Sequence, residues 1–346
     1  MALGSLRLPA APPPVADYVL GGTGEEALRD VVSLSGGGLM LGGALVGDST
    51  QGNRTATGHG DSDFWLVRLD AGLQPLWDRA YGGAGPDDLR RVVPLRDGGF
   101  LLIGGSASDP GGTRTAPREG GYDGWVARVA ADGTPLWDRA YGALDADRLE
   151  HGVELADGGF LLVGTSSSEP GPGKTGPFYG SSDAWVVRVD ARGNRLWDRT
   201  YGGSFSEEFL VVLADPLGGF VVAGWSESAP GTGNKTSSAH GRRDAWVLRL
   251  DDDGGVLWDR SLGGRNEDWA TDVVFAPDGG LLVVGNSVSR EGGTKTSPNF
   301  SPADGVTLAS DGWLNRLDPS GMLLWDRSLG GAEPDGFQRG FAAPGG

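Results

Sequence analysis

A pair of tryptophans twelve residues apart recurs five times along this 346-residue chain, and no other feature restricts the fold as much. Successive first members lie 60, 60, 61 and 67 residues apart. Ten of the 12 tryptophans belong to the pattern and are interpreted as structural residues of the repeat, namely Trp65/Trp77, Trp125/Trp137, Trp185/Trp197, Trp246/Trp258 and Trp313/Trp325. A fixed period indicates one supersecondary unit copied along the chain, so the fold follows from a single unit.

Each unit divides into four short strands, a to d. In the second copy we expect strands at residues 90–95, 100–106, 124–129 and 135–141. Asp97-Gly98-Gly99 separates a from b, and Ala131-Asp132-Gly133 separates c from d. Aspartate can bond its own backbone and glycine accepts φ > 0, so both segments are typical of tight hairpin turns. No segment shows the 3.6-residue period of a helix.

Four antiparallel strands per repeat, copied around an axis, indicate an all-β fold, a five-bladed β-propeller. A six-bladed ring or a longer array cut short remain alternatives, because six segments look like strand a. The passages at 17–38 and 326–346 are both copies of the d-to-a connection. We expect residues 1–16 to be a disordered, Pro-rich segment and 17–346 to be one propeller domain. The redundant C-terminal a-strand segment, 337–346, would pack outside the ring or displace the N-terminal copy.

Composition excludes several classes of protein. The 63 glycines and 21 prolines approach the range of disordered chains, but 12 Trp, 11 Phe and 6 Tyr indicate a folded chain. A formal net charge of −17 argues against nucleic-acid binding. No apolar run reaches the 18 residues of a membrane span. The absence of cysteine excludes disulfides, thiolate zinc sites and cysteine nucleophiles.

The repeat resembles those of exported β-propeller proteins of Bacteroidetes. The residues that carry the resemblance are Lys174-Thr175, Ser182-Asp183, 185–190, Gly193-Asn194, 196–199 and 201–203, and it covers about residues 17–346. It implies a secreted or cell-surface propeller, often cargo of type IX secretion and a module of a larger protein. It implies no catalytic chemistry. The first sixteen residues lack the apolar core of a signal peptide.

Two sets of polar residues recur in every unit. A cation and a threonine stand in each b–c loop: Arg54-Thr55, Arg114-Thr115, Lys174-Thr175, Lys235-Thr236 and Lys295-Thr296. They could form an anion-binding ring, but residues common to all blades favour a loop latch. Strand c carries a recurring arginine at positions 68, 128, 188, 249 and 316. Hairpin register predicts an ion pair between it and the aspartate of the Trp-Asp-Arg motif in strand d.

Catalytic patterns are sparse. His59, His151 and His240 stand near no nucleophile motif. Calcium is the metal considered, because Asp61-Ser62-Asp63 and 251–254 cluster hard oxygen ligands. Acidic pairs at 87–88, 207–208 and 267–268 are interpreted as solvated loop residues. The sequence therefore predicts no catalytic residue and no cofactor.

Strand alternation places all b–c loops and d–a passages on one face of the ring, and long loops commonly carry function. The candidate binding residues on this face are His59, Arg118, Tyr122, Phe178, Tyr179, His240, Arg243 and Phe300. The predicted function is a non-enzymatic, monomeric, exported binding or scaffold module for a protein or glycan partner. A lectin-like propeller is the first alternative. A glycan hydrolase or lyase, with an acid such as Asp304 in the fifth-blade insertion, is the second.

Overall fold

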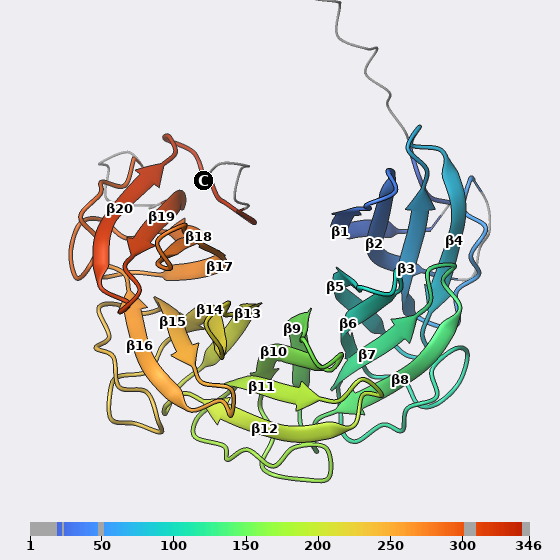
Figure 1. Cartoon of the computed structure of the whole chain (residues 1–346), viewed down its shortest axis with the longest axis horizontal. Coiled ribbons are helices and arrows are strands. Elements are labelled where there is room, and N and C mark those ends of the chain that lie inside the picture. Colours follow the sequence, from blue (N-terminus) through green and yellow to red (C-terminus); the bar gives the residue numbers. More distant parts are fainter. Residues whose placement is uncertain (1–18, 23, 48–51, 301–308, 341–346) are drawn as a thin grey trace, which may run out of the picture.

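A computed structural model describes residues 19–22, 24–47, 52–300 and 309–340. This part of the chain holds 20 strands and no helix, arranged as five antiparallel four-stranded sheets (Figure 1). The blades, in chain order, are β1 (Glu26–Ser33), β2 (Leu39–Val46), β3 (Ser62–Leu69), β4 (Pro75–Tyr81); β5 (Asp87–Pro94), β6 (Phe100–Ser106), β7 (Asp123–Val129), β8 (Pro135–Tyr141); β9 (Asp147–Glu154), β10 (Phe160–Ser166), β11 (Asp183–Val189), β12 (Arg195–Tyr201); β13 (Glu207–Ala214), β14 (Phe220–Ser226), β15 (Asp244–Leu250), β16 (Val256–Leu262); and β17 (Asp268–Phe275), β18 (Leu281–Ser287), β19 (Asp311–Leu317), β20 (Leu323–Leu329). The five-bladed propeller predicted from the repeat is confirmed.

The second blade shows how closely the pattern fixed the strands. Strands β6 and β8 have the predicted bounds, and β7 begins one residue earlier. Strand β5 begins at Asp87, three residues before the predicted start, because Asp87 and Leu89 are fully buried and pair with β6. A bulge between Leu89 and Arg91 interrupts the alternation there, and such irregularities hide a strand from period-two patterns.

The tight turns follow the glycine signal. Gly98 and Gly133 adopt φ of 85° and 81°, and Asp97 and Asp132 each accept a hydrogen bond from the backbone two residues on. The matching c–d turn of the first blade is the exception. Leu73 stands where the other blades have glycine, and it adopts φ of 62°. Leucine is strained in this region because its Cβ crowds the backbone.

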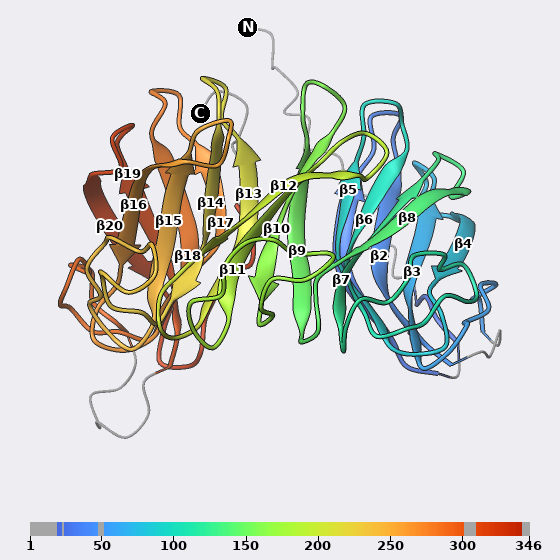
Figure 2. The ribbon, with the colours of Figure 1, turned by 90° about the horizontal axis from the view of Figure 1, so that it is seen from below.

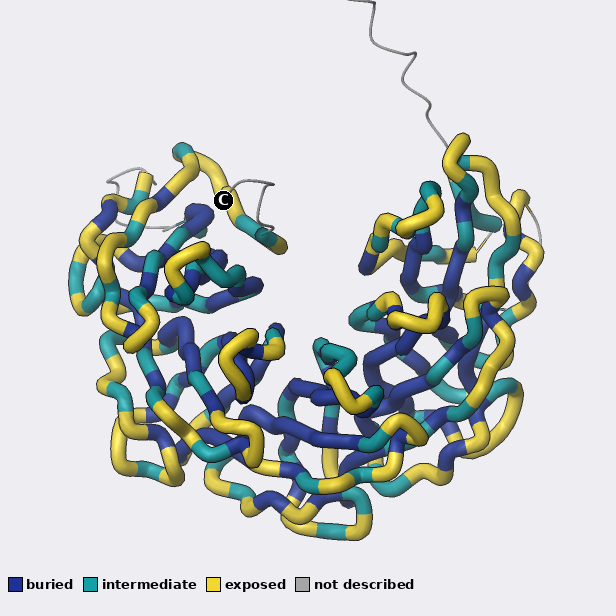
Figure 3. The backbone as a smooth tube through the Cα atoms, viewed as in Figure 1, coloured by how far each residue is buried: buried dark blue, intermediate teal, exposed yellow. Residues whose placement is uncertain are grey.

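Apolar cores form mainly between neighbouring blades. The first strand of each blade lies nearest the axis and the fourth lies outside (Figure 1). The first tryptophan of every pair lies on strand c and is at most 2% exposed, and the strands are dark in Figure 3: these residues are Trp65, Trp125, Trp185, Trp246 and Trp313. Each junction from blades 1–2 to blades 4–5 has its own hydrophobic cluster. Adjacent blades therefore stabilise one another.

The second tryptophan of each pair has a different environment from the first. Those on the outer strands of the first four blades are only half-buried, namely Trp77, Trp137, Trp197 and Trp258. In the first blade, Trp77 packs partly on the core between blades one and two, and the guanidinium of Arg79 lies over its ring at 5.7 Å. The reason is that strand d is the edge of its blade, so the ring is covered on one side by the next blade, including its c–d turn. In the fifth blade, Trp325 is exposed.

The arc of five blades leaves an opening between β1 and the fifth blade (Figure 1). No hydrophobic cluster among the described residues joins these two blades. The described C-terminal residues contact the fifth blade: the Asp335 N–H donates to the Ser310 carbonyl, and the Phe337 N–H donates to the side-chain oxygen of Asn286. An ion pair of 2.6 Å between Arg339 and Asp30 links this segment to β1.

The two faces differ as the strand directions require. Figure 2 shows the blades from the side, with the long b–c loops gathered along one edge. We call this edge the loop face. No helix in the described ranges is long and apolar enough to cross a membrane.

Candidate functional site

Each b–c loop is fastened to its own blade by the aspartate of strand d. In the third blade, Asp198 accepts hydrogen bonds from the Thr175 hydroxyl, from the backbone N–H groups of Thr175 and Gly176, and from Trp185 Nε1 at 3.1 Å. The corresponding aspartates of the other blades accept the same set from their threonine and tryptophan. These bonds outweigh the cost of burial and lower the pKa of Asp198.

The recurring loop cations do not form an anion-binding ring. Lys174 is fully buried, and its Nζ donates to the carbonyls of Ser168 and Gly176 at 2.8 Å. The other four cations are at most 2% exposed and bond within the protein. Burial lowers the pKa of Lys174, since desolvation penalises the charged form. The predicted loop latch is confirmed.

The predicted ion pair between the arginine of strand c and the aspartate of strand d is wrong. Arg188 lies directly opposite Trp197, whereas Asp198 lies opposite Val187 and is occupied by the latch. Arg188 instead pairs with Asp157 of the a–b turn. Its counterparts in the second, fourth and fifth blades make the same pair. Arg68 bonds to carbonyls instead, because the first blade has no aspartate in that turn.

The interpretation of the paired acids as solvated loop residues is also wrong. Asp87, Glu207 and Asp268 are fully buried. Each accepts a hydrogen bond of 2.8 Å from the N–H of a glycine in the preceding passage. Desolvation raises the pKa of Asp87 and Asp268. These acids hold the blade-to-blade passages in shape, so they are structural groups and not a hydrolytic pair.

Four of the predicted binding residues occupy one equivalent loop position. His59, Tyr179, His240 and Phe300 each donate their backbone N–H to the first aspartate of strand c. A Cβ on the glycine at the matching turn of the next loop would lie within 3 Å of His59, Tyr179 and His240. These side chains therefore line the loop face where neighbouring loops meet, far from one another around the arc.

Arg118 and Phe178 also lie on the loop face but are not gathered with the others. Arg118 is exposed and bonds to the carbonyls of Gly120 and Gly121 in its own loop. Phe178 is half-buried beside Tyr179 in sequence. Neither residue joins a cluster of polar groups among the described residues.

Tyr122 and Arg243, by contrast, reach the axis and join residues that the sequence did not single out. Together they form a group that we call the axial cluster, consisting of Asp88, Arg90, Tyr122, Arg148, Glu150, Glu208, Trp225, Glu227 and Arg243. These residues belong to the first strands of blades two to four and to their b–c connections, except Trp225, which lies on β14. A hollow of about 790 Å³, lined by Asp88 and Tyr122 and by β1, opens beside the cluster.

Ion pairs and ring contacts hold the axial cluster together. Arg90 lies 2.8 Å from Asp88 and 3.6 Å from Glu150, which is 3.8 Å from Arg148. The guanidinium of Arg148 lies over the Tyr122 ring at 5.7 Å. Cation–π contacts of this kind fix both partners in orientation.

The fourth blade adds a second aromatic ring and two further acids. Arg243 lies 4.0 Å from the Trp225 ring and pairs with Glu227 at 2.8 Å, and Trp225 Nε1 donates to Glu208. Burial, opposed by Arg90 and strengthened by Glu208, raises the pKa of Glu150 to about 7. The site therefore offers aromatic faces, guanidinium groups and a carboxyl that titrates near neutral pH.

The axial cluster breaks the fivefold pattern. The residue before strand c is Ser62, Tyr122, Ser182, Arg243 and Ser310 in successive blades, and Trp225 has Gly105 as its counterpart in the second blade. A Cβ on Gly105 would lie 2.2 Å from the Tyr122 ring, so the glycine makes room for the tyrosine. Aligning the repeats and marking their differences is the sequence signal that would have found these residues.

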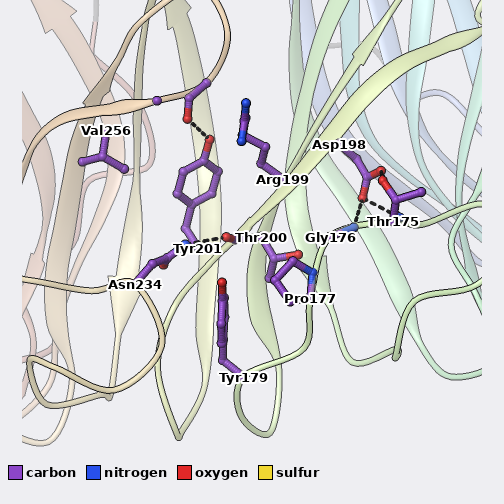
Figure 4. Close-up of a pocket in the computed structure, with 12 residues that line it drawn as sticks. Thr175, Gly176, Pro177, Tyr179, Asp198, Arg199, Thr200, Tyr201, Asn234 and Val256 are labelled. Atoms are coloured by element: carbon purple, nitrogen blue, oxygen red, sulfur yellow. Dashed lines mark hydrogen bonds between the residues drawn. The ribbon is translucent and has the colours of Figure 1, made fainter.

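A second concave region lies on the outside of the arc, between the third and fourth blades. Figure 4 shows this groove of about 340 Å³, lined by Tyr179, Arg199, Tyr201 and Asn234 together with the latch of the third blade. The Tyr201 hydroxyl donates to the Gly254 carbonyl at 2.6 Å and Asn234 bonds the Thr200 carbonyl, so both are already engaged. A smaller groove occupies the corresponding place between the first and second blades.

Within the described ranges, no three His, Asp or Glu side chains gather as metal ligands. At the two proposed calcium positions, Asp63 accepts the His59 N–H and Asp251 accepts two N–H groups of its own turn. His151 lies on β9, where its Nδ1 faces the Val212 N–H at 3.4 Å. Asp304 lies outside the described residues.

No family model matches the chain. Regulatory protein FlaEY of Caulobacter vibrioides is 28% identical over 191 residues, which is 53% of this chain and 20% of that protein. The chain thus spans about a fifth of its relative's length.

Three solved structures overlap distantly. A Bacteroides caccae protein of unknown function has a TM-score of 0.44 and 12% identity, with 92% of this chain and 88% of that chain covered. The Neurospora crassa Pan2 WD40 domain has a TM-score of 0.48 and 10% identity, with 88% of this chain and 66% of that chain covered. Kuenenia stuttgartiensis hydrazine synthase has a TM-score of 0.45 and 13% identity, with 89% of this chain and 68% of that chain covered. At these values we draw no functional argument from them.

Proposed function

We propose that this chain is a non-enzymatic, exported or cell-surface binding module that holds a protein partner at the axial end of its loop face. The observation that carries the proposal is the axial cluster. Residues repeated in every blade are used in latches and junctions, whereas the axial cluster contains residues that differ between blades. A ligand that binds one place on a repetitive scaffold needs such asymmetric residues.

The chemistry of the cluster favours a polypeptide partner. Tyr122 and Trp225 present large, partly exposed rings, and Arg148 and Arg243 lie over them. Tyrosine, tryptophan and arginine are the residues most enriched at energetically important positions of protein interfaces. The long loops around them would form the polar rim, and no metal or organic cofactor is needed for this role.

The test is selection of ligands on the immobilised full chain with a displayed random-peptide library. We expect enriched peptides whose affinity falls at least tenfold for Tyr122→Ala and for Trp225→Ala. The matched control is Arg192→Ala, an exposed residue in a c–d turn on the opposite face. Circular dichroism confirms that each variant is folded. Peptides that lose affinity only with Arg192→Ala would place binding on the other face and refute the proposal.

A lectin-like function is the second candidate, and the groove between the third and fourth blades supports it. Tyr179 offers a ring for stacking on a sugar, while Arg199 offers a guanidinium for polar contact. A glycan array probed with the full chain separates the two candidates. If Tyr179→Ala abolishes glycan binding and Trp225→Ala leaves it unchanged, the binding site is the groove and not the axial cluster.

Export is tested separately by fractionating cells that produce the native protein. We expect the chain outside the cytoplasm, on the cell surface or in the medium. Recovery in the cytoplasmic fraction alone would contradict the exported part of the proposal while leaving the binding site open.

A further inference from the structure

The C-terminal segment 331–340 repeats the contacts that begin a blade. In the fourth blade, the Gly203 N–H donates to Glu207, whose own N–H donates to the Ser182 carbonyl at 2.9 Å. In the C-terminal segment, the Gly331 N–H donates to Asp335 at 2.7 Å, and the Asp335 N–H donates to the Ser310 carbonyl at 2.6 Å. Residues 331–340 therefore meet the fifth blade with the contacts that a first strand makes, although they are not part of the 20 strands.

Side chains of the segment reproduce the junction as well. Phe337 packs on Gly312, as Leu149 packs on Gly124 at the junction of blades two and three. The Gly340 N–H donates to Asp272 at 2.9 Å, just as the Val92 N–H donates to Asp30. Among the described residues, no strand pairs with the other edge of this segment.

The outer strand of each blade carries the second half of the junction. A Cβ on Gly321 would lie 2.9 Å from the Trp258 ring, because this tryptophan packs directly on the c–d turn of the next blade. Arg260 Nε donates to the Gly321 carbonyl at 2.9 Å. The same packing joins Trp77 to Gly133, Trp137 to Gly193 and Trp197 to Gly254.

The fifth blade has the corresponding residues, Trp325 and Arg327, but among the described residues no c–d turn of a further blade packs against them. Trp325 is 45% exposed, and Leu329 is 45% exposed where its counterpart Leu262 is 2% exposed. Arg327 lies over its own Trp325 ring, and no carbonyl of the described residues accepts a hydrogen bond from it. Figure 3 shows this end of the arc largely exposed. On the far side of the opening, Leu28 is 54% exposed, whereas the equivalent Leu89 is fully buried.

We propose that this open end binds one further blade of the same repeat type, with residues 331–340 as its first strand. The further blade would add three strands to this segment in the order b, c and d, as in the five blades present. Trp325 and Arg327 require a c–d turn with glycine at the position of Gly321. The ion pair of Arg339 with Asp30 links the same segment to β1, the first strand of the first blade.

A second copy of this chain does not fit the same surface. Among the described residues, the c–d turns of blades two to five are each packed by a tryptophan of the preceding blade, which leaves the turn of the first blade, and that turn carries Leu73 in place of glycine. At the four existing junctions a Cβ at this position would lie 2.8 to 3.0 Å from the tryptophan ring, closer than side chains pack. Direct closure of the fifth blade onto the first meets the same obstacle.

In the experiment, a copy of residues 153–201 replaces residues 341–346 of the chain. Residue 153 follows Gly152, which is the counterpart of Gly340 in the third blade. Hydrogen exchange then reports on residues 331–340 and on β20. We expect at least tenfold slower exchange in both, together with protection of the added strands and a higher Tm. In the control, Gly193→Leu in the added copy alone should remove most of this gain. Protected added strands with unchanged exchange in β20, or added strands that remain unprotected, would overturn the proposal.

Sedimentation of the unextended chain tests the competing occupant. We expect a monomer at micromolar concentration. Head-to-tail oligomers that disappear with Trp325→Ala would show that a second copy covers this surface, and would also overturn the proposal. Neither measurement depends on the axial cluster, so the proposed binding function is tested apart from it.

Discussion

At the scale of single residues, the aspartate of strand d has the largest structural role. It receives the N–H groups of the loop, a threonine hydroxyl and an indole N–H, so one buried carboxylate fixes a loop of about fifteen residues. A buried donor that loses its acceptor has a full desolvation cost. The same residue type on the loop surface would have little effect.

We therefore expect Asp198→Ala to lower the free energy of unfolding by about 3 kcal/mol, because Trp185 Nε1 and two N–H groups lose their acceptor. Urea denaturation followed by tryptophan fluorescence measures the change. Asp253→Ala, at an exposed turn position, serves as the control and should change stability by less than about 0.5 kcal/mol. Equal effects of the two substitutions would contradict the latch.

Glu150 gives the residue-scale prediction for pH. Its pKa is raised from 4.5 to about 7 by burial. A carboxyl whose pKa is raised in the folded state does not change the free energy of unfolding at pH values below its unfolded pKa, because it is protonated in both states there. Its ionisation destabilises the fold progressively as the pH rises from about 4.5 through 7.

The stability of the wild type, relative to Glu150→Gln, should consequently fall between pH 5 and pH 8. One pKa unit corresponds to about 1.4 kcal/mol, so the shift from 4.5 to about 7 gives a relative loss of roughly 2 to 3 kcal/mol between these pH values. Urea denaturation of both proteins at the two pH values measures it. A constant difference across this range would show that Glu150 is not desolvated.

At the scale of elements, strand bounds and turns follow local residue types, and one turn departs from the rule. Leu73 adopts a backbone conformation that the other blades give to glycine. Left-handed backbone is costly for residues with a Cβ. The first blade tolerates this residue because no preceding tryptophan packs on its turn.

Replacing Leu73 by glycine should raise the free energy of unfolding by about 1 kcal/mol through relief of this strain. The reverse change, Gly193→Leu, should be strongly destabilising because a Cβ there would also lie 2.8 Å from Trp137. Chemical denaturation of both variants checks the pair. Destabilisation by Leu73→Gly would mean that contacts of the half-buried leucine outweigh the strain.

At the scale of the whole molecule, stability is distributed along the arc. The third blade has hydrophobic clusters on both sides, whereas the first and fifth blades each have one neighbour. In repeat proteins, the stability of each unit depends on its interfaces with adjacent units. The terminal blades therefore open more readily than the central one.

Native-state hydrogen exchange should show this order directly. We expect β10 and β11 to exchange slowest, with β1 and β20 exchanging at least tenfold faster, since local opening needs less free energy at the ends. Mass spectrometry of peptic fragments resolves the strands. Uniform protection from β1 to β20 would indicate that the opening is closed in solution.

The sequence by itself determined the repeat, the strands, the tight turns and the number of blades, because these depend on spacings within about sixty residues. It also predicted the latch, whose partners lie in the same unit. It misjudged the arginine of strand c and the buried acids, since hairpin register and passage geometry decide which side chains face one another.

Only the tertiary structure decided the axial cluster and the open end. Tyr122, Glu150 and Arg243 belong to three different blades, and no local pattern relates them. Likewise, Trp325 is identical in type to Trp77 and to the three other outer tryptophans that are partly covered, and only its place at the end of the arc leaves it exposed. Contacts within a repeat are encoded by its own residues, whereas contacts between repeats depend on how the blades are set around the axis.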